Sequence, residues 1–171
     1  MKKVILACMA LLALVISSCG SKASKADFPG TDEGAKQLTG ELLKGNSSFL
    51  PSLRPTDADI EALFDASVVA PMKAYVAKTY AEISKAKIGG KDGQTELLFK
   101  IAKSEDFVAM NEAAKDFPGG YSSNGAMFKP GVTWYAWKFV KPGETTGMAF
   151  DGLTFVNQHW VWVPKPFRAM K

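Results

Sequence analysis

The chain has 171 residues, with 21 basic and 17 acidic side chains and a formal net charge of +4. This length suffices for one domain with its own hydrophobic core. A single histidine and two cysteines exclude a zinc site of the usual kinds within one chain. The sequence also has no Gly-rich phosphate loop, HExxH motif or GxSxG motif. We therefore expect no metal and no cofactor.

The first 19 residues have the features of an export signal. Lys2 and Lys3 precede an uncharged apolar stretch, residues 4–16, and Ser17-Ser18-Cys19 follows it. A membrane-spanning helix needs about 20 apolar residues, so this stretch is too short for one and matches the apolar core of a cleaved signal. The segment resembles a bacterial lipoprotein signal peptide with its lipobox.

That resemblance implies that residues 1–18 are removed and that Cys19 becomes lipidated at the new N-terminus. The lipid bilayer is then the first expected partner, with the domain outside the cytoplasm. Gly20 follows Cys19, which resembles the default for transfer to the outer membrane rather than the cell membrane. Ordinary secretion with cleavage after Ala26 is the alternative, because Ser24 and Ala26 are small.

Processing changes the charge and the domain boundaries. Removal of residues 1–18 takes away Lys2 and Lys3, so the 21 basic residues become 19 against 17 acidic ones. The resulting charge of about +2 gives no argument for a nucleic-acid partner. Residues 19–31 contain the small, polar run GSKASKAD and are typical of a flexible tether. Residues 32–171 are predicted to form a single globular domain.

Three helices are predicted in the first half of this domain. The first begins at Asp32 and ends at Gly45, and the second follows Thr56, a natural N-cap. The third is expected to begin at Pro71, which suits a first helical turn. Its buried stripe repeats at helical spacing and consists of Met72, Tyr75, Val76, Thr79, Tyr80 and Ile83.

The second half is predicted to be mainly strands. Residues 94–102 alternate apolar and polar side chains and indicate a strand, with a short helix as the alternative. One helix is expected from Ser104 to Pro118. Pro142-Gly143 suits a type II turn, and Asn157-Gln158 has the length of a tight hairpin loop. These turns separate three strands, at residues 132–140, 147–156 and 159–163.

The tight hairpin predicts which residues face each other. A two-residue loop places Val156 opposite His159, Phe155 opposite Trp160 and Leu153 opposite Trp162. Strict alternation then puts Asp151 on the same face as Leu153 and the two tryptophans. His159 falls on the other face and is expected to be an exposed structural residue, which disfavours a Ser-His-Asp triad.

Asp151 is the candidate catalytic residue, because burial beside large aromatic rings disfavours the charged form of a carboxylate. It would act as a general acid or base, with Tyr75, Tyr80 or Tyr135 as a hydrogen-bond donor. The alternative is a structural residue at the strand's edge that accepts backbone or tryptophan N–H bonds.

Large rings on both faces of residues 132–140 suggest that one face of the sheet lines a cleft or meets a partner. Trp134 points one way, whereas Tyr135 and Trp137 point the other way. The predicted ligand or partner surface consists of Trp134, Tyr135, Trp137, Asp151, Trp160 and Trp162.

The order of elements predicts an α+β fold, with N-terminal helices packed on one face of a curved antiparallel sheet. Over residues 32–167 this order resembles the cystatin-like and NTF2-like group. The resemblance implies a cone-shaped pocket, which in a few enzymes of the group holds an Asp acid or base.

The leading hypothesis is a non-catalytic envelope lipoprotein that binds a small apolar ligand or another envelope protein. The alternatives are an enzyme that uses Asp151 and a purely structural lipoprotein.

Overall fold

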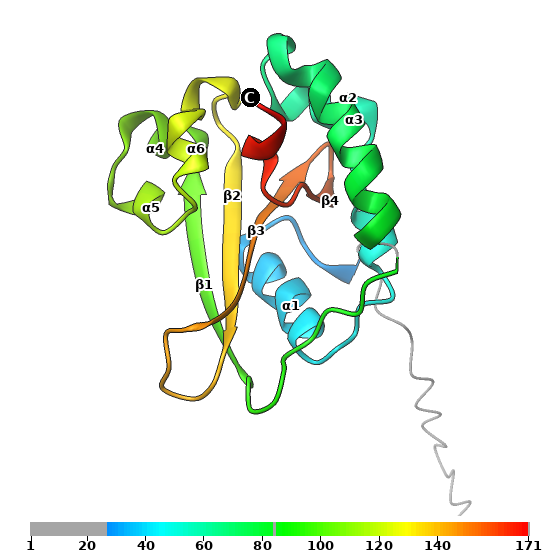
Figure 1. Ribbon diagram of the computed structural model, residues 1–171, viewed down its shortest axis with the longest axis vertical. Helices are drawn as coiled ribbons and strands as arrows, with labels where there is room; N and C mark the ends of the chain where they lie inside the picture. Colours follow the sequence, from blue (N-terminus) through cyan, green and yellow to red (C-terminus); the bar gives the residue numbers. More distant parts are fainter. Residues whose placement is uncertain (1–26, 84, 171) are drawn as a thin grey trace, which may run out of the picture.

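The computed structural model describes residues 27–83 and 85–170 (Figure 1). The predicted signal peptide, Cys19 and most of the predicted tether lie outside these residues. Within the described part, no helix combines the length and apolar character needed to cross a membrane. Among the described residues, the buried apolar core extends from Phe28 to Val163.

The predicted α+β architecture is confirmed: helices pack against one curved, four-stranded antiparallel sheet with strand order β1-β2-β3-β4. The strands are β1 (Glu96–Lys103), β2 (Thr133–Val140), β3 (Gly147–Val156) and β4 (His159–Trp162). The helices are α1 (Asp32–Leu43), α2 (Asp57–Leu63), α3 (Ala66–Ile83), α4 (Ser104–Ala109), α5 (Glu112–Lys115) and α6 (Gly120–Ser123). Short 3-10 turns include η2 (Leu50–Leu53) and η4 (Pro166–Ala169).

Side-chain caps fix where the early helices begin. Thr31 rather than Asp32 caps α1, and Thr56 caps α2 as predicted, in a reciprocal capping box with Asp59. The predicted start of α3 at Pro71 is wrong, because the helix begins five residues earlier. Asp65 explains the earlier start: its Oδ1 accepts a hydrogen bond of 2.9 Å from the backbone N–H of Ser67.

The helix predicted from Ser104 to Pro118 is also wrong in its length. Met110 adopts a left-handed conformation, with φ of 52°, and ends α4. Asn111 then caps α5 by accepting a bond from the backbone N–H of Ala114. A residue that caps a new helix competes with continuation of the previous one, and here the cap prevails.

The strand interpretation of residues 94–102 is confirmed, since β1 pairs with β2 along its whole length. The turn at Pro142-Gly143 closes with a 2.9 Å bond from Glu144 N–H to the Lys141 carbonyl, and Gly143 has φ of 74°. Asn157 and Gln158 both have positive φ, as a type I′ hairpin requires. The predicted pairing of β3 with β4 is confirmed residue by residue.

A bulge at Gly152 changes the face on which Asp151 lies. Tyr135 pairs with Leu153, yet the next residue of β2, Ala136, pairs with Asp151. Gly152 is therefore the extra residue, and its φ of 89° is in the region that favours glycine. Since Tyr135 and Ala136 point to opposite faces, Leu153 and Asp151 do as well. The predicted common face for Asp151 and Leu153 is wrong.

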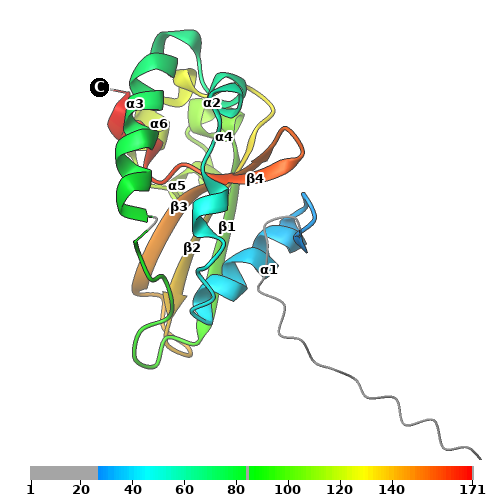
Figure 2. The same ribbon diagram turned by 90° about the vertical axis from the view of Figure 1, so that its right-hand side faces the viewer.

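The sheet has two faces, which we name by the residues of β2. The inner face carries Tyr135, Trp137 and Phe139, and the outer face carries Trp134, Ala136 and Lys138. In Figure 1, α1 and α3 lie to the right of the sheet and α4, α5 and α6 lie to its left; Figure 2 looks onto the side of α1 and α3.

Polar contacts attach the helices to the inner face. The hydroxyl of Tyr135 donates to Asp32 at the start of α1, over 2.8 Å. The hydroxyl of Tyr80 in α3 donates to the carbonyl of Trp162, also over 2.8 Å. On the outer face, the upper end of the sheet is covered around Trp134, whose indole N–H donates to Ser104 Oγ of α4.

Replacement of Gly152 by alanine should destabilise the domain far more than the same change at Gly143. A Cβ at position 152 would lie 1.9 Å from the Val163 carbonyl oxygen, whereas one at position 143 would meet no atom within 4 Å. Both positions have positive φ, which costs alanine about 1 kcal/mol. We expect Gly143→Ala to lower the free energy of unfolding by about that amount and Gly152→Ala by about 3 kcal/mol or more, measured by urea denaturation. Equal losses would contradict the bulge.

Candidate functional site

The predicted aromatic partner surface is buried, and the prediction of an exposed surface is wrong. Its five rings, Trp134, Tyr135, Trp137, Trp160 and Trp162, are at most 4% exposed. Helices cover both faces of the sheet at this level. Most of the ring polar groups also have partners inside the protein: Trp160 donates to the Phe28 carbonyl and Trp162 to the Asp151 carbonyl. These side chains form the core of the domain.

Asp151 lies on the outer face beside the bulge and is 5% exposed. Its Oδ1 accepts two hydrogen bonds, one of 2.9 Å from the Tyr121 hydroxyl and one of 2.8 Å from the Lys165 backbone N–H. Among the described residues, Oδ2 has no hydrogen-bond partner. Asp151 therefore connects α6 and the C-terminal segment to the centre of β3.

Burial raises the pKa of the Asp151 carboxyl, while the bond from the Lys165 amide and the bond from Tyr121 act in the opposite direction. Burial also raises the pKa of Tyr121 well above its ordinary value, so this hydroxyl stays protonated and donates to the carboxylate. Asp151 has features of both predicted roles. Its pKa is raised, as for a candidate acid or base, and it accepts a backbone N–H bond, as a structural residue would.

None of the three tyrosines predicted to donate a hydrogen bond to Asp151 does so. Tyr75, Tyr80 and Tyr135 donate their hydroxyls to Pro164, Trp162 and Asp32, respectively. The donor is Tyr121, which stacks on Phe128 in the aromatic cluster under α4. Its position after Pro118-Gly119-Gly120 predicted only the end of a helix, so the sequence held no specific signal for this role.

A groove on the outer face is lined by Asp151 of β3 and by Asp116, Phe117 and Pro118 from the segment between α5 and α6. Its volume is about 530 Å³. Three strands supply an apolar floor, with Leu98 from β1, Ala136 from β2 and Ala149 from β3. Lys100, Lys138 and Thr145 also line it.

A smaller cleft of about 300 Å³ lies between β3 and α3, and Asp151 lines it as well. Its other walls include Tyr75 of α3, Trp162 of β4 and Arg168 of η4. The two hollows share three consecutive residues of β3, Ala149, Phe150 and Asp151. Of the predicted surface residues, Trp137 and Asp151 line the groove, and Asp151 and Trp162 line the smaller cleft.

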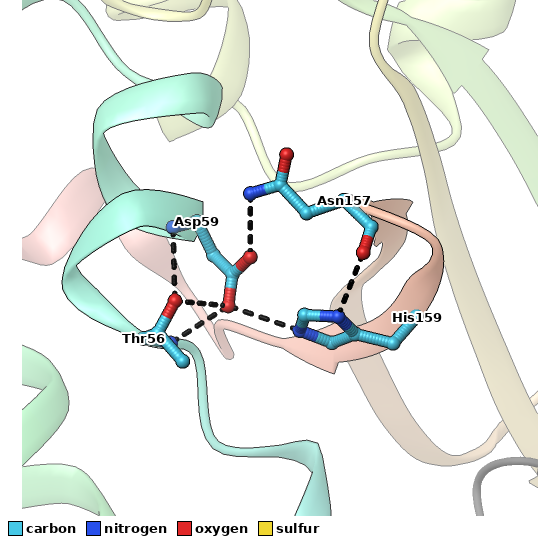
Figure 3. Close-up of polar contacts among 4 residues, drawn as sticks. All are labelled: Thr56, Asp59, Asn157 and His159. Carbon is cyan, nitrogen blue, oxygen red and sulfur yellow. Dashed lines mark hydrogen bonds and ion pairs between the residues drawn. The ribbon is translucent and has the colours of Figure 1, made fainter.

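His159, expected to be exposed, instead contacts a buried carboxylate (Figure 3). Its Nε2 lies 3.0 Å from Asp59 Oδ2, and its Nδ1 lies 3.0 Å from the Asn157 carbonyl oxygen. Asp59 is fully buried, whereas the side chain of His159 is 27% exposed. The prediction of an exposed residue is wrong because α2 packs over the mouth of the hairpin.

Asp59 has more partners than any other carboxylate in this region. Oδ2 accepts bonds of 2.7 Å from both the backbone N–H and the hydroxyl of Thr56, and Oδ1 accepts one of 2.8 Å from Asn157 Nδ2. Burial acts to raise the pKa of Asp59, but the bonds from Thr56, Asn157 and His159 outweigh it, so the pKa is lowered. The cluster is a clamp that holds the hairpin to α2.

The described residues contain no group of three or more His, Cys, Asp or Glu side chains that could bind a metal ion. Comparison with protein-family models, curated proteins and solved structures gave no match to this chain. The groove and its surroundings are therefore the basis for a proposal about function.

Replacement of Asp59 by asparagine should remove stability that depends on pH. The folded protein lowers the pKa of Asp59, so the stabilisation is present above the unfolded value of about 3.9 and is lost as the pH falls through the folded value. We expect Asp59→Asn to lower the free energy of unfolding by about 1–3 kcal/mol at pH 6 and by progressively less below pH 4. Urea denaturation over this pH range measures the difference. Asp57 lies two residues before Asp59 and is exposed. Asp57→Asn is therefore the control and should change the free energy of unfolding by less than about 0.5 kcal/mol. A loss for Asp59→Asn that is constant with pH would contradict the clamp.

Two substitutions at Asp151 should have opposite consequences. Asparagine keeps an oxygen for Tyr121 and Lys165 and removes a buried charge whose pKa is raised, so stability at pH 7 should be unchanged or higher. Alanine leaves the hydroxyl and the amide without an acceptor and should cost about 2–3 kcal/mol. Thermal and urea unfolding measure both. An Asp151→Asn protein as unstable as Asp151→Ala would show that the charge itself holds this region together.

Proposed function

We propose that this chain is a lipid-anchored protein of the cell envelope whose single domain binds a small ligand in the outer-face groove without catalysis. The anchor rests on the apolar stretch of residues 4–16 followed by Ser17-Ser18-Cys19. The domain would then lie outside the cytoplasm, on the cell membrane or the outer membrane. Acyl chains contribute about 0.8 kcal/mol per buried methylene, so several chains at Cys19 would make the attachment nearly permanent.

The groove is the observation that carries the binding proposal. Small-molecule sites typically have volumes of about 300–1,000 Å³, apolar walls and a few polar groups, and the groove of about 530 Å³ fits this description. Its floor is formed by strands, which hold Leu98, Ala136 and Ala149 in fixed positions. Ala149 is exposed, and β3 is the edge strand at this point, because β4 pairs only with residues 153–156 of β3.

The surroundings of Asp151 support binding rather than catalysis. The carboxylate is held by Tyr121 and Lys165, and both bonds connect it to the protein's own framework. The histidine is engaged by Asp59 in a separate cluster. An enzyme that uses Asp151 as a general acid is the second candidate, favoured by the raised pKa of this group in a cleft. The resemblance to the cystatin-like and NTF2-like group stays a prediction, and neither candidate depends on it.

Native mass spectrometry of the protein extracted from its own host tests both parts of the proposal. We expect a chain that begins at acylated Cys19 and a co-purifying small molecule. Ala149→Trp should remove the small molecule and leave acylation unchanged, because the new ring fills the groove without entering the core. Lys78→Trp, on the exposed side of α3, is the control and should keep the ligand. A chain that begins after Ala26 would refute the anchor, and the absence of a bound mass or its retention in Ala149→Trp would refute the groove.

A further inference from the structure

The groove contains one unpaired positive charge. Lys100 forms an ion pair of 3.0 Å with Asp116, so these two residues largely neutralise each other. Asp151 is 5% exposed and its Oδ1 is bonded to Tyr121 and Lys165. Lys138 has no ion pair among the described residues. A ligand therefore meets a single available cation on an otherwise apolar floor.

Lys138 sits in the middle of that floor. In the sheet it lies between Leu98 of β1 and Ala149 of β3, which are its direct partners on the two sides. The methylene stem of a lysine packs well along such apolar neighbours and leaves the ammonium group at the surface. The next outer-face residue of β2 toward the covered end is Ala136, and beyond it the groove is walled by Phe117 and Pro118. Lys138 is exposed, whereas Ala136 and Phe117 are buried, at 6% and 5% exposure.

We propose that the groove binds a single-chain amphiphile with a carboxylate head, a fatty acid or a close analogue. The head pairs with Lys138, and the aliphatic chain lies over Ala136 against Phe117 and Pro118. One unpaired cation matches one negative charge, and small floor residues leave room for a chain of methylene groups. A cationic amphiphile finds no exposed, unpaired carboxylate, since Asp116 is paired with Lys100 and Asp151 is 5% exposed. This inference rests on the proposed ligand-binding function and names its ligand.

Binding of decanoate, decanol and decylamine to residues 20–171, below their micellar concentrations, tests the proposal. This segment contains every described residue of the buried core, and it lacks the predicted lipid anchor, so the measurement needs no detergent that would compete for the groove. We expect decanoate to bind about tenfold more tightly than the other two, as a charge-assisted hydrogen bond would give. Amide chemical shifts should change at Leu98 and Ala136, which line only the groove, and not around Arg168, which lines only the smaller cleft.

Variants at Lys138 distinguish the contribution of the ligand's head group to binding from that of its aliphatic chain. Lys138→Met keeps the apolar stem and should bind decanoate and decanol equally. Lys138→Glu should reverse the order and favour decylamine. Lys78→Glu makes the same change of net charge on α3, away from the groove, and should behave like the unmodified domain. A urea unfolding curve for each variant verifies that the fold is intact.

The other outcomes distinguish this inference from the proposed function. Equal affinity for decanoate and decanol in the unmodified domain refutes the carboxylate head and leaves the groove as a binding site. Tighter binding of decylamine, or of decyl phosphate by more than tenfold over decanoate, also overturns the carboxylate assignment. If none of these ligands shifts the groove amides while a molecule co-purifies from the host, only the inference fails. If nothing co-purifies either, the proposed function fails with it.

Discussion

One inserted residue, Gly152, determines what each face of the sheet presents. Without the bulge, Asp151 would lie on the inner face with Leu153 and the tryptophans. With it, Leu153 fills the inner core and Asp151 reaches Tyr121 and Lys165 on the outer face. The backbone at Gly152 also exchanges a bond with Val163, whose N–H donates to the Gly152 carbonyl over 2.9 Å. A Cβ would remove this close approach.

The bulge also divides the outer face into a covered part and an open part. Above Asp151, α4, α5 and α6 bury Trp134 through the rings of Phe128 and Tyr121. Below it, small or charged side chains replace the rings, and the sheet is left open as the groove. The boundary falls where Tyr121 bonds Asp151, because this contact anchors α6 at the limit of the covered region. The same interaction that satisfies the buried carboxylate therefore sets the end of the groove.

Local signals in the sequence predicted the elements that depend on neighbouring residues. Thr56 capped its helix as expected, and Asn157-Gln158 fixed the register of β3 with β4, because a two-residue loop leaves no other pairing. The start of α3 was predicted wrongly because proline is common in the first turn of a helix, whereas Pro71 lies five residues after the start of α3. The contact of Tyr121 with Asp151 and that of His159 with Asp59 join residues 30 and 100 positions apart, and the bulge depends on the pairing of β3 with β2. Periodicity contains no information about such contacts, and the number of large rings after residue 120 suggested an exposed surface where the helices provide a cover.

The position of the clamp explains how a domain without disulfides keeps its hairpin in place. β4 has four residues and pairs only with β3, so two-stranded pairing alone would hold it weakly. Asp59 supplies the missing restraint from α2, through Asn157 and His159 at the tip of the hairpin. Trp160, at the centre of β4, then bonds the carbonyl of Phe28 and ties down the start of the described chain.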